Sequence, residues 1–236
     1  MQFHLETIPV WAAVEHAGPC PICELHNSCE QNEVERSLGG SVMEPSERVR
    51  VNKLGFCPHH HEALKSMNNR LGHALMVDSH AIEKLETLRE LDKNLQSAEK
   101  GGLFSKKDAL PAVLEALKEM NTSCVICDNV NTHMKRYLDT FVYLWHKEES
   151  FATAVEKGGI CLPHAQALME ASQHQLSKPK QSVFARFLLA LLLRDLTEDE
   201  ADLKWFTLKF DYRNQDKPWG NSKNALERTI TLLRGQ

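Results

Sequence analysis

Cysteine and histidine supply the sequence's main potential for chemistry, because they recur in two short motifs. Cys-x-x-Cys occurs as CPIC and CVIC, and Cys-x-x-His occurs as CPHH and CLPH. Three thiolates and one imidazole form a closed tetrahedral set that is typical of structural zinc. The sequence therefore predicts two Cys3His sites and two Zn²⁺ ions per chain, with eight ligand candidates: Cys20, Cys23, Cys57, His60, Cys124, Cys127, Cys161 and His164.

The eight candidates repeat at a constant offset of 104 positions. Cys57 follows Cys23 by 34 positions, and Cys161 follows Cys127 by the same 34 positions. Further identical residues share the offset, in the pairs Ile22 and Ile126, Asn27 and Asn131, Val51 and Val155, Lys53 and Lys157, Gly55 and Gly159, Ala63 and Ala167, and Leu64 and Leu168. The chain therefore contains an internal duplication, and we expect each copy to be built around its own metal site.

The register of the duplication selects one histidine from the triplet His59, His60 and His61. His60 aligns with His164, whereas a proline and an alanine stand opposite the other two. In Cys-x-x-His the cysteine is expected at the entry to a helix and the histidine about one turn later, so that both side chains lie on one face. We therefore predict that His60 is a ligand and that His59 and His61 are exposed polar residues.

Helical patterns dominate the rest of the sequence, and strand patterns are nearly absent. Helices are expected over residues 7–17, 24–38, 46–53, 58–95 with a break near 68–69, 108–120, 128–149, 151–157, 163–175, 181–210 and 222–234. Gly55 and Gly159 precede the two Cys-x-x-His motifs and supply permissive backbone there. The predicted fold is all-α, with two tandem helical repeats related by pseudo-two-fold symmetry.

The expected organisation is a first metal-binding repeat over residues 1–96, a linker over 97–107, and a second repeat over 108–236. The linker is predicted from its Lys, Gly and Ser content. Isolated helices would leave their apolar faces half buried, so the two repeats are expected to pack as one unit.

The composition is that of a soluble globular protein, with 236 residues, 42% of them hydrophobic, and a net charge of -4. This charge gives no support for a nucleic-acid or anionic-membrane partner. The N-terminus lacks the pattern of a signal peptide, and the most apolar run is interrupted by Arg186 and Arg194. We expect a cytoplasmic protein, and in that compartment cysteines are more often metal ligands or redox groups than disulfides.

Three classes of function fit these features. The first is an interaction scaffold or adaptor with structural zinc sites, whose groove between the halves binds a protein or peptide. The second is an iron–sulfur or thiol-based redox protein, because three thiolates and a histidine also hold clusters. The third is a metal-dependent nucleic-acid binder, which the scarcity of basic residues after Cys57 and Cys161 disfavours. No catalytic motif is present, and a full Cys3His set leaves no open coordination position, so we expect no enzyme.

Three further features have a functional and a structural interpretation. The loop Gly39–Ser41 could bind an anion, or it could simply end a helix. Cys29 and its counterpart His133 could be additional ligands, or ordinary helical residues. His73 and His80, with Asp78 nearby, could form a third metal site, or lie on a solvated helix face.

The chain also resembles a family of uncharacterised bacterial proteins that is labelled only as a domain of unknown function. The resemblance rests on the phrases ETIPVW, CPIC, GGSVMEP, VNKLGFCPHH, NRLG, ALM, CVIC and GGICLPH, and it covers nearly the whole chain. It implies a cytoplasmic bacterial protein with a paired, Cys/His-containing helical fold, and it implies no activity.

Overall fold

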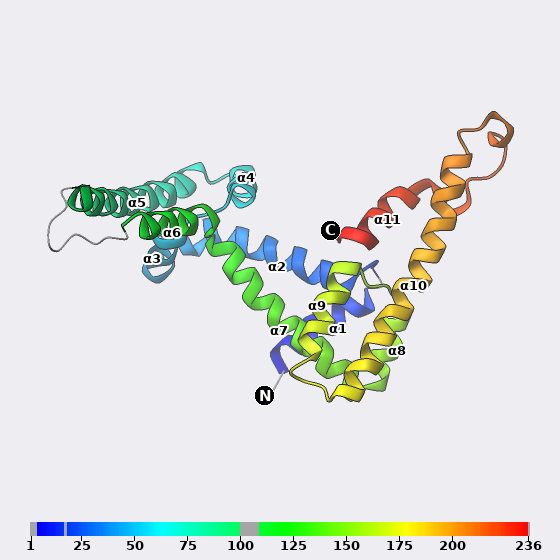
Figure 1. The fold of residues 1–236 in the computed structure, drawn as a ribbon. Helices are drawn as coiled ribbons and strands as arrows, with labels where there is room; N and C mark the ends of the chain where they lie inside the picture. Colours follow the sequence, from blue (N-terminus) through cyan, green and yellow to red (C-terminus); the bar gives the residue numbers. More distant parts are fainter. Residues whose placement is uncertain (1–3, 17, 100–108, 236) are drawn as a thin grey trace. The chain divides into compact units, whose positions relative to one another are not determined.

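The computed structural model describes residues 4–16, 18–99 and 109–235 (Figure 1). Within these ranges the chain forms α-helices and short 3₁₀ turns and no strand, which confirms the all-α prediction. The chain divides into two compact units, the first from residues 1–28 and 132–236 and the second from residues 29–131.

The first unit contains the helices from the two ends of the chain. They are α1 (His4–Glu15), the start of α2 (Pro21–Leu38), the end of α7 (Val125–Lys147), α8 (Glu149–Lys157), α9 (Leu162–Ser172), α10 (Lys178–Leu208), the 3₁₀ turns η2 (Tyr212–Asn214) and η3 (Gly220–Asn224), and α11 (Ala225–Arg234). The second unit contains the middle of the chain. It holds the end of α2, η1 (Gly40–Val42), α3 (Pro45–Leu54), α4 (Pro58–Ser66), α5 (Arg70–Glu99), α6 (Ala109–Thr122) and the start of α7.

The two units differ from the two sequence repeats. At the offset of 104 positions, α1 to α5 correspond in order to α6 to α10. The first unit combines α1 and the start of α2 from the first copy with α8, α9 and α10 from the second copy, and the second unit combines the complementary parts. The two copies therefore exchange their N-terminal helices, and the chain passes between the units inside α2 and inside α7.

The expected helix boundaries hold to within a few residues, and the one informative difference lies in the predicted linker. The break predicted near residues 68–69 is present, because α4 ends at Ser66 and α5 begins at Arg70. Of the predicted linker, residues 97–99 complete α5, and residues 100–107 lie outside the described residues.

Aromatic side chains form the core of the first unit. Phe141, Phe151 and Phe184 are fully buried. The ring of Trp11 in α1 packs edge to face on that of Phe151 in α8, with 5.0 Å between ring centroids. The rings of Trp145 in α7 and Phe184 in α10 are tilted relative to each other, with 4.5 Å between ring centroids. Edge-to-face pairs of this kind add to the stabilisation that comes from burial alone, so α1 is fixed to helices that belong to the other sequence copy.

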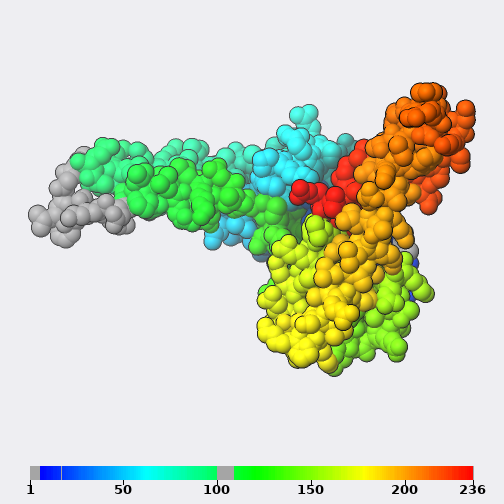
Figure 2. Space-filling model, turned by 45° about the vertical axis from the view of Figure 1, so that its right-hand side comes forward, coloured from blue at the N-terminus to red at the C-terminus, as the bar shows by residue number. Residues whose placement is uncertain are grey.

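The long helix α10 buries one face and exposes the other. Phe184, Leu188 and Leu191 are buried, whereas Leu189 and Leu193 are exposed. The amphipathic α11 packs along α10, and the space-filling view shows the two helices in contact (Figure 2). None of the described helices combines the length with the uninterrupted apolar sequence that a membrane crossing requires.

In the second unit, α3 packs against α5, and polar contacts fix the two helices together. Arg48 of α3 donates hydrogen bonds to the carbonyl oxygen of Leu75 and to the hydroxyl of Ser79. His80 Nδ1 lies 2.7 Å from the carbonyl oxygen of Asn52, so the imidazole donates from Nδ1 and is held over the end of α3.

Gly55 ends α3 in a conformation that other residues rarely adopt. Its φ is 65°, as the prediction of permissive backbone before Cys57 requires. An added Cβ would lie 2.6 Å from Nε2 of His80. The Gly55 carbonyl accepts a hydrogen bond of 3.0 Å from the backbone N–H of Val125. This glycine therefore ties the loop before Cys57 to the start of α7.

We predict that Gly55→Ala lowers the free energy of unfolding by at least about 1–3 kcal/mol, because a side chain is strained at positive φ and also collides with His80. Urea denaturation of the metal-loaded protein measures the effect. Gly40→Ala is the matched control, since its Cβ meets no atom within 4 Å. Equal unfolding free energies for the two variants would contradict this account.

Candidate metal centres

The structure brings the eight predicted ligands together in two groups, each of three cysteines and one histidine. Site 1, in the first unit, consists of Cys20, Cys23, Cys161 and His164; site 2, in the second unit, consists of Cys57, His60, Cys124 and Cys127. In each group all four ligand atoms lie within 4.8 Å of one another.

The grouping corrects the expectation that each copy is closed around its own site. Site 1 takes its Cys-x-x-Cys from the first copy and its Cys-x-x-His from the second, and site 2 does the reverse. This crossed pairing follows from the exchanged helices. Each Cys-x-x-Cys lies at the start of α2 or α7, and that end of the helix belongs to the unit that contains the Cys-x-x-His of the other copy.

All four motifs open a helix, which explains why each places two ligands on one side. Cys57 and Cys161 are the N-cap residues of α4 and α9, and Cys20 and Cys124 stand one residue before α2 and α7. The second ligand of each motif therefore lies in the first helical turn. Unpaired N–H groups and the helix dipole favour negative charge at such a terminus, so each site has two helix N-termini that stabilise thiolates.

The distances in site 1 fit a single tetrahedral ion. His164 Nδ1 lies 3.1 Å from the sulfur of Cys161, 3.3 Å from that of Cys23 and 3.5 Å from that of Cys20. The sulfurs of Cys23 and Cys161 lie 3.7 Å apart. A tetrahedral zinc ion with ordinary bond lengths separates two sulfurs by about 3.8 Å and a sulfur from a nitrogen by about 3.6 Å.

Site 2 repeats this geometry. His60 Nδ1 lies 3.2 Å from the sulfurs of Cys57 and Cys124 and 3.4 Å from that of Cys127. The sulfurs of Cys57 and Cys127 lie 3.8 Å apart. A disulfide needs about 2.05 Å between sulfurs, and all seven cysteines are free. Both sets could therefore hold an ion, and their sulfurs are too far apart for sulfur–sulfur bonds.

The crowded groups bind protons tightly when no cation is present. Hydrogen bonds from Cys161 and Cys23, together with burial, raise the pKa of the Cys20 thiol far above its ordinary value. Burial and the charge of a neighbouring thiol raise the pKa of Cys127 to about 12. Burial acts to lower the pKa of His164, but hydrogen bonds to two of the thiols outweigh it and raise this pKa to about 9. A bound cation would remove the mutual repulsion that opposes ionisation of the thiols.

The surroundings of site 1 exclude water more completely than those of site 2. The three cysteines of site 1 are at most 2% exposed, whereas Cys57 and Cys127 are partly exposed. Gly235, which ends α11 with a φ of 80°, lies over site 1; an added Cβ would be 3.7 Å from the sulfurs of Cys23 and Cys161. This contact has no signal in the sequence, because no motif in the final helix pairs it with Cys161, more than 70 positions earlier.

The glycine before each Cys-x-x-His has a different purpose at each site. Gly159 lacks the positive φ of Gly55, but an added Cβ would lie 2.7 Å from the carbonyl oxygen of Pro19. The counterpart of Val125, whose N–H bonds to Gly55, is Pro21, which has no N–H to donate. Site 1 therefore joins its two ligand loops by close packing, where site 2 uses a backbone hydrogen bond.

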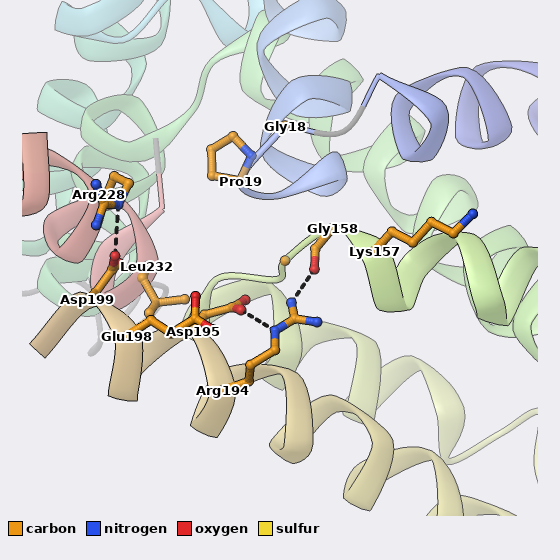
Figure 3. Close-up of a pocket in the computed structure, with 11 residues that line it drawn as sticks. Gly18, Pro19, Lys157, Gly158, Arg194, Asp195, Glu198, Asp199, Arg228 and Leu232 are labelled. Atoms are coloured by element: carbon orange, nitrogen blue, oxygen red, sulfur yellow. Dashed lines mark hydrogen bonds and ion pairs between the residues drawn. The ribbon is translucent and has the colours of Figure 1, made fainter. Parts of the chain in front are cut away.

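A cleft of about 450 Å³ lies beside site 1, and its guanidinium groups support the ligand loops (Figure 3). Arg194 of α10 donates to the carbonyl oxygens of Glu156 and Gly158, which stand five and three positions before Cys161. Arg228 of α11 donates to carboxylates on α10, those of Asp199 and Asp202. These bonds hold the end of α8 and the position of α11, and α11 in turn covers site 1.

The histidine triplet divides as predicted for His60, but His59 and His61 have partners. His59 Nε2 lies 3.1 Å from Oε1 of Glu30, and the same oxygen lies 3.0 Å from Nε2 of His60. His61 Nδ1 lies 2.9 Å from Nε2 of His73, and the two rings are stacked. Glu30 was not predicted; an acidic residue two turns after Cys-x-x-Cys was the only available signal.

The remaining candidates lie outside both groups. His73 pairs with His61 and His80 with the carbonyl of Asn52, so the two do not form a joint group with Asp78 among the described residues. Cys29 is buried in α2, and His133 accepts a hydrogen bond from Arg136. The Gly39–Ser41 segment ends α2 and enters the 3₁₀ turn η1, as its structural interpretation predicts.

Comparison with known proteins gives a family and one relative of similar length. The model of a family described as "Family of unknown function (DUF6062)" matches residues 1–236. The chain is 26% identical over 196 residues to an "Uncharacterized 23.9 kDa protein in xynA 3'region" from Caldicellulosiruptor sp. (strain Rt8B.4), with 83% of this chain and 84% of the relative covered. No solved structure matches the chain.

The crossed pairing predicts which double variants lose one ion and which lose two. Cys20→Ser with Cys161→Ser removes two ligands of the same site, so one ion per chain should remain. Cys20→Ser with Cys57→Ser damages both sites, so neither ion should be retained. Elemental analysis of the purified variants measures the difference.

Pairing within each copy would give the opposite result, with one ion retained by the Cys20/Cys57 double variant and none by the Cys20/Cys161 one. Cys29→Ser is the control and should retain both ions, since Cys29 belongs to neither group. Circular dichroism should show full helicity for Cys29→Ser, and a loss of helical signal in the double variants that follows the number of ions lost.

Proposed function

The chain belongs to the family of unknown function DUF6062, and this family implies no activity. From the two Cys3His sets we propose that the protein binds two Zn²⁺ ions and that both ions are structural. The observation that carries this proposal is the spacing of the ligand atoms. Each imidazole nitrogen lies 3.1–3.5 Å from three sulfurs, which is close to what one tetrahedral Zn²⁺ requires.

The same spacing argues against the iron–sulfur alternative. All four ligand atoms of each set lie within 4.8 Å of one another, and that distance suits a single ion. In a four-iron cluster each ligand binds a different iron atom, so the ligands must stand farther apart. A mononuclear site of soft thiolates and one imidazole is the set that zinc commonly occupies.

The thiol chemistry argues against a redox dithiol. A reactive Cys-x-x-Cys pair needs a thiol whose pKa is lowered toward neutrality, so that the thiolate forms readily. Here the pKa of Cys20 is raised by hydrogen bonds to neighbouring thiols and by burial, and the pKa of Cys127 is raised by burial and by a neighbouring thiol. The neighbouring thiols that raise these pKa values make the cysteines poor nucleophiles. The same neighbours are needed if the cysteines are to bind one metal ion together.

A structural role follows from coordination number and from connectivity. Four protein ligands fill a tetrahedral zinc ion and leave no position for water or substrate. The ion in site 1 would join residues 138–144 positions apart in the sequence, and that in site 2 would join residues up to 70 positions apart. Fixing such long loops has a large entropic cost, and metal binding of this kind contributes on the order of 10 kcal/mol to folding.

We propose further that the protein is a cytoplasmic interaction scaffold whose partner is a protein or peptide. Leu110, Leu114 and Leu117 recur along α6 at helical spacing and are 60%, 58% and 39% exposed. Apolar side chains in a row on a helix surface are a common feature of helix-mediated recognition. The alternative of a nucleic-acid binder has less support, because α9 contains no Lys or Arg and α4 contains a single Lys.

We predict that the protein purified without added metal contains two zinc ions per chain and is colourless. Removal of zinc with a strong chelator should cause cooperative loss of helical circular dichroism, because each ion fixes segments that are distant in sequence. Restoring Zn²⁺ should restore the signal. Iron with visible absorbance, or full helicity after zinc removal, would exclude structural zinc.

The scaffold role predicts that Leu110, Leu114 and Leu117 together, changed to Ser, abolish co-purification of a partner protein from the source cells while two zinc ions are retained. The exposed charged residues Glu115, Lys118 and Glu119 of the same helix, changed to Ser, are the matched control. An unchanged set of co-purifying proteins in the leucine variant would exclude this face as the binding surface.

A further inference from the structure

The two sites have identical ligands, but only one of the two histidines has a carboxylate behind it. Nε2 of His60, the nitrogen that faces away from the sulfurs, lies 3.0 Å from Oε1 of Glu30. Among the described residues, no carboxylate bonds to the corresponding nitrogen of His164. The residue that corresponds to Glu30 in the duplication is Met134, whose thioether is at best a weak acceptor.

The geometry fixes the direction of the hydrogen bond. Because Nδ1 of His60 faces the three sulfurs of site 2, a bound ion would occupy that nitrogen and leave the proton on Nε2. The Nε2–H group then donates to Glu30. His60 is only 3% exposed and Glu30 is 27% exposed at the side chain, so this bond is shielded from water over much of its surface.

His59 gives Glu30 a second contact. Its Nε2 lies 3.1 Å from the same oxygen, Oε1, and its ring packs edge to face on that of His60 at 5.1 Å. The side chain of His59 is 71% exposed, so its hydrogen bond is weakened by water. His59 therefore restricts the position of the Glu30 carboxylate, and this carboxylate contacts the imidazole of His60.

We propose that Glu30 is a positioning residue of site 2, which orients His60 and makes site 2 retain its metal ion more tightly than His60 alone would allow. This inference rests on the proposed metal-binding function. A carboxylate that accepts the proton of a ligand imidazole fixes the ring and makes the other nitrogen a better donor, and loss of such a partner weakens metal binding about 10–100-fold.

The test compares Glu30→Gln and Glu30→Ala with the unchanged protein, each loaded with cadmium-113. Each site gives its own NMR signal, assigned through couplings to the cysteine β-protons of that site. Competition with EDTA then measures metal retention at both sites in the same molecule. We expect the site 2 signal to disappear at about 10–100-fold lower EDTA in the Ala variant, with a smaller effect in the Gln variant, which keeps a neutral acceptor.

Site 1 is the internal control and should release its ion at the same EDTA concentration in every variant. Glu35→Gln is the matched control variant, since Glu35 lies on the same helix and, within the described part of the chain, its side chain bonds to Gln31 and not to a histidine. His59→Ala should retain both ions and weaken site 2 less than Glu30→Ala does.

A second readout separates positioning from a general structural effect. In the metal-loaded protein the Nε2–H proton of His60 should give a resolved resonance that exchanges slowly, and this resonance should shift and broaden in Glu30→Gln while that of His164 stays unchanged. Equal loss of metal from both sites, or unchanged retention at site 2 in Glu30→Ala, would overturn the inference. An unchanged protein that binds no ion at either site would instead overturn the proposed function.

Discussion

The structure depends on three thiols and an imidazole being held within 4.8 Å of one another, twice in one chain. In the absence of a cation the crowding opposes ionisation, since hydrogen bonds to neighbouring thiols and burial raise the pKa of Cys20, and burial and a neighbouring thiol raise that of Cys127. A bound divalent cation would compensate the thiolate charge and form four bonds at once. Each unit has only helices around this cluster, and the helices supply the N-termini that face the sulfurs. Site and fold therefore require one another.

The exchange between the copies changes what each metal site does for the chain. A site closed within one copy would stabilise a local segment of about 40 residues. The observed sites join the N-terminal part of one copy to the C-terminal part of the other, so neither copy can complete its metal centre alone. Because α2 and α7 each begin in one unit and end in the other, unfolding of one unit disturbs a helix that the other unit uses.

The sequence was sufficient to predict the eight residues that gather in the two Cys3His groups and the helical class, because the duplication repeats each of these residues at one offset and the helical periodicity is strong. It was not sufficient to predict the crossed pairing. The observed α2 has 18 residues and carries the chain about 27 Å along the helix axis. The 10 residues of α3 and the loops on either side of it are long enough to lead back to Cys23, so the chain length permits either pairing. Glu30 and Gly235 could not be predicted either, since their roles depend on contacts that have no periodic or motif signal.

The duplication preserved the ligands and diversified what supports them. Site 2 has a backbone hydrogen bond from Val125 to Gly55 and a carboxylate behind His60. At the corresponding positions site 1 has Pro21, which has no N–H, and Met134, which has no carboxylate; it relies on the close packing of Gly159 against Pro19 and on the cover that α11 provides. Both sites have three cysteines and one histidine. We therefore attribute any difference in metal retention between them to the residues that surround these four side chains. Site 1 is the more deeply buried and site 2 has a carboxylate against its histidine, which are two physically distinct ways in which the same kind of ion could be held.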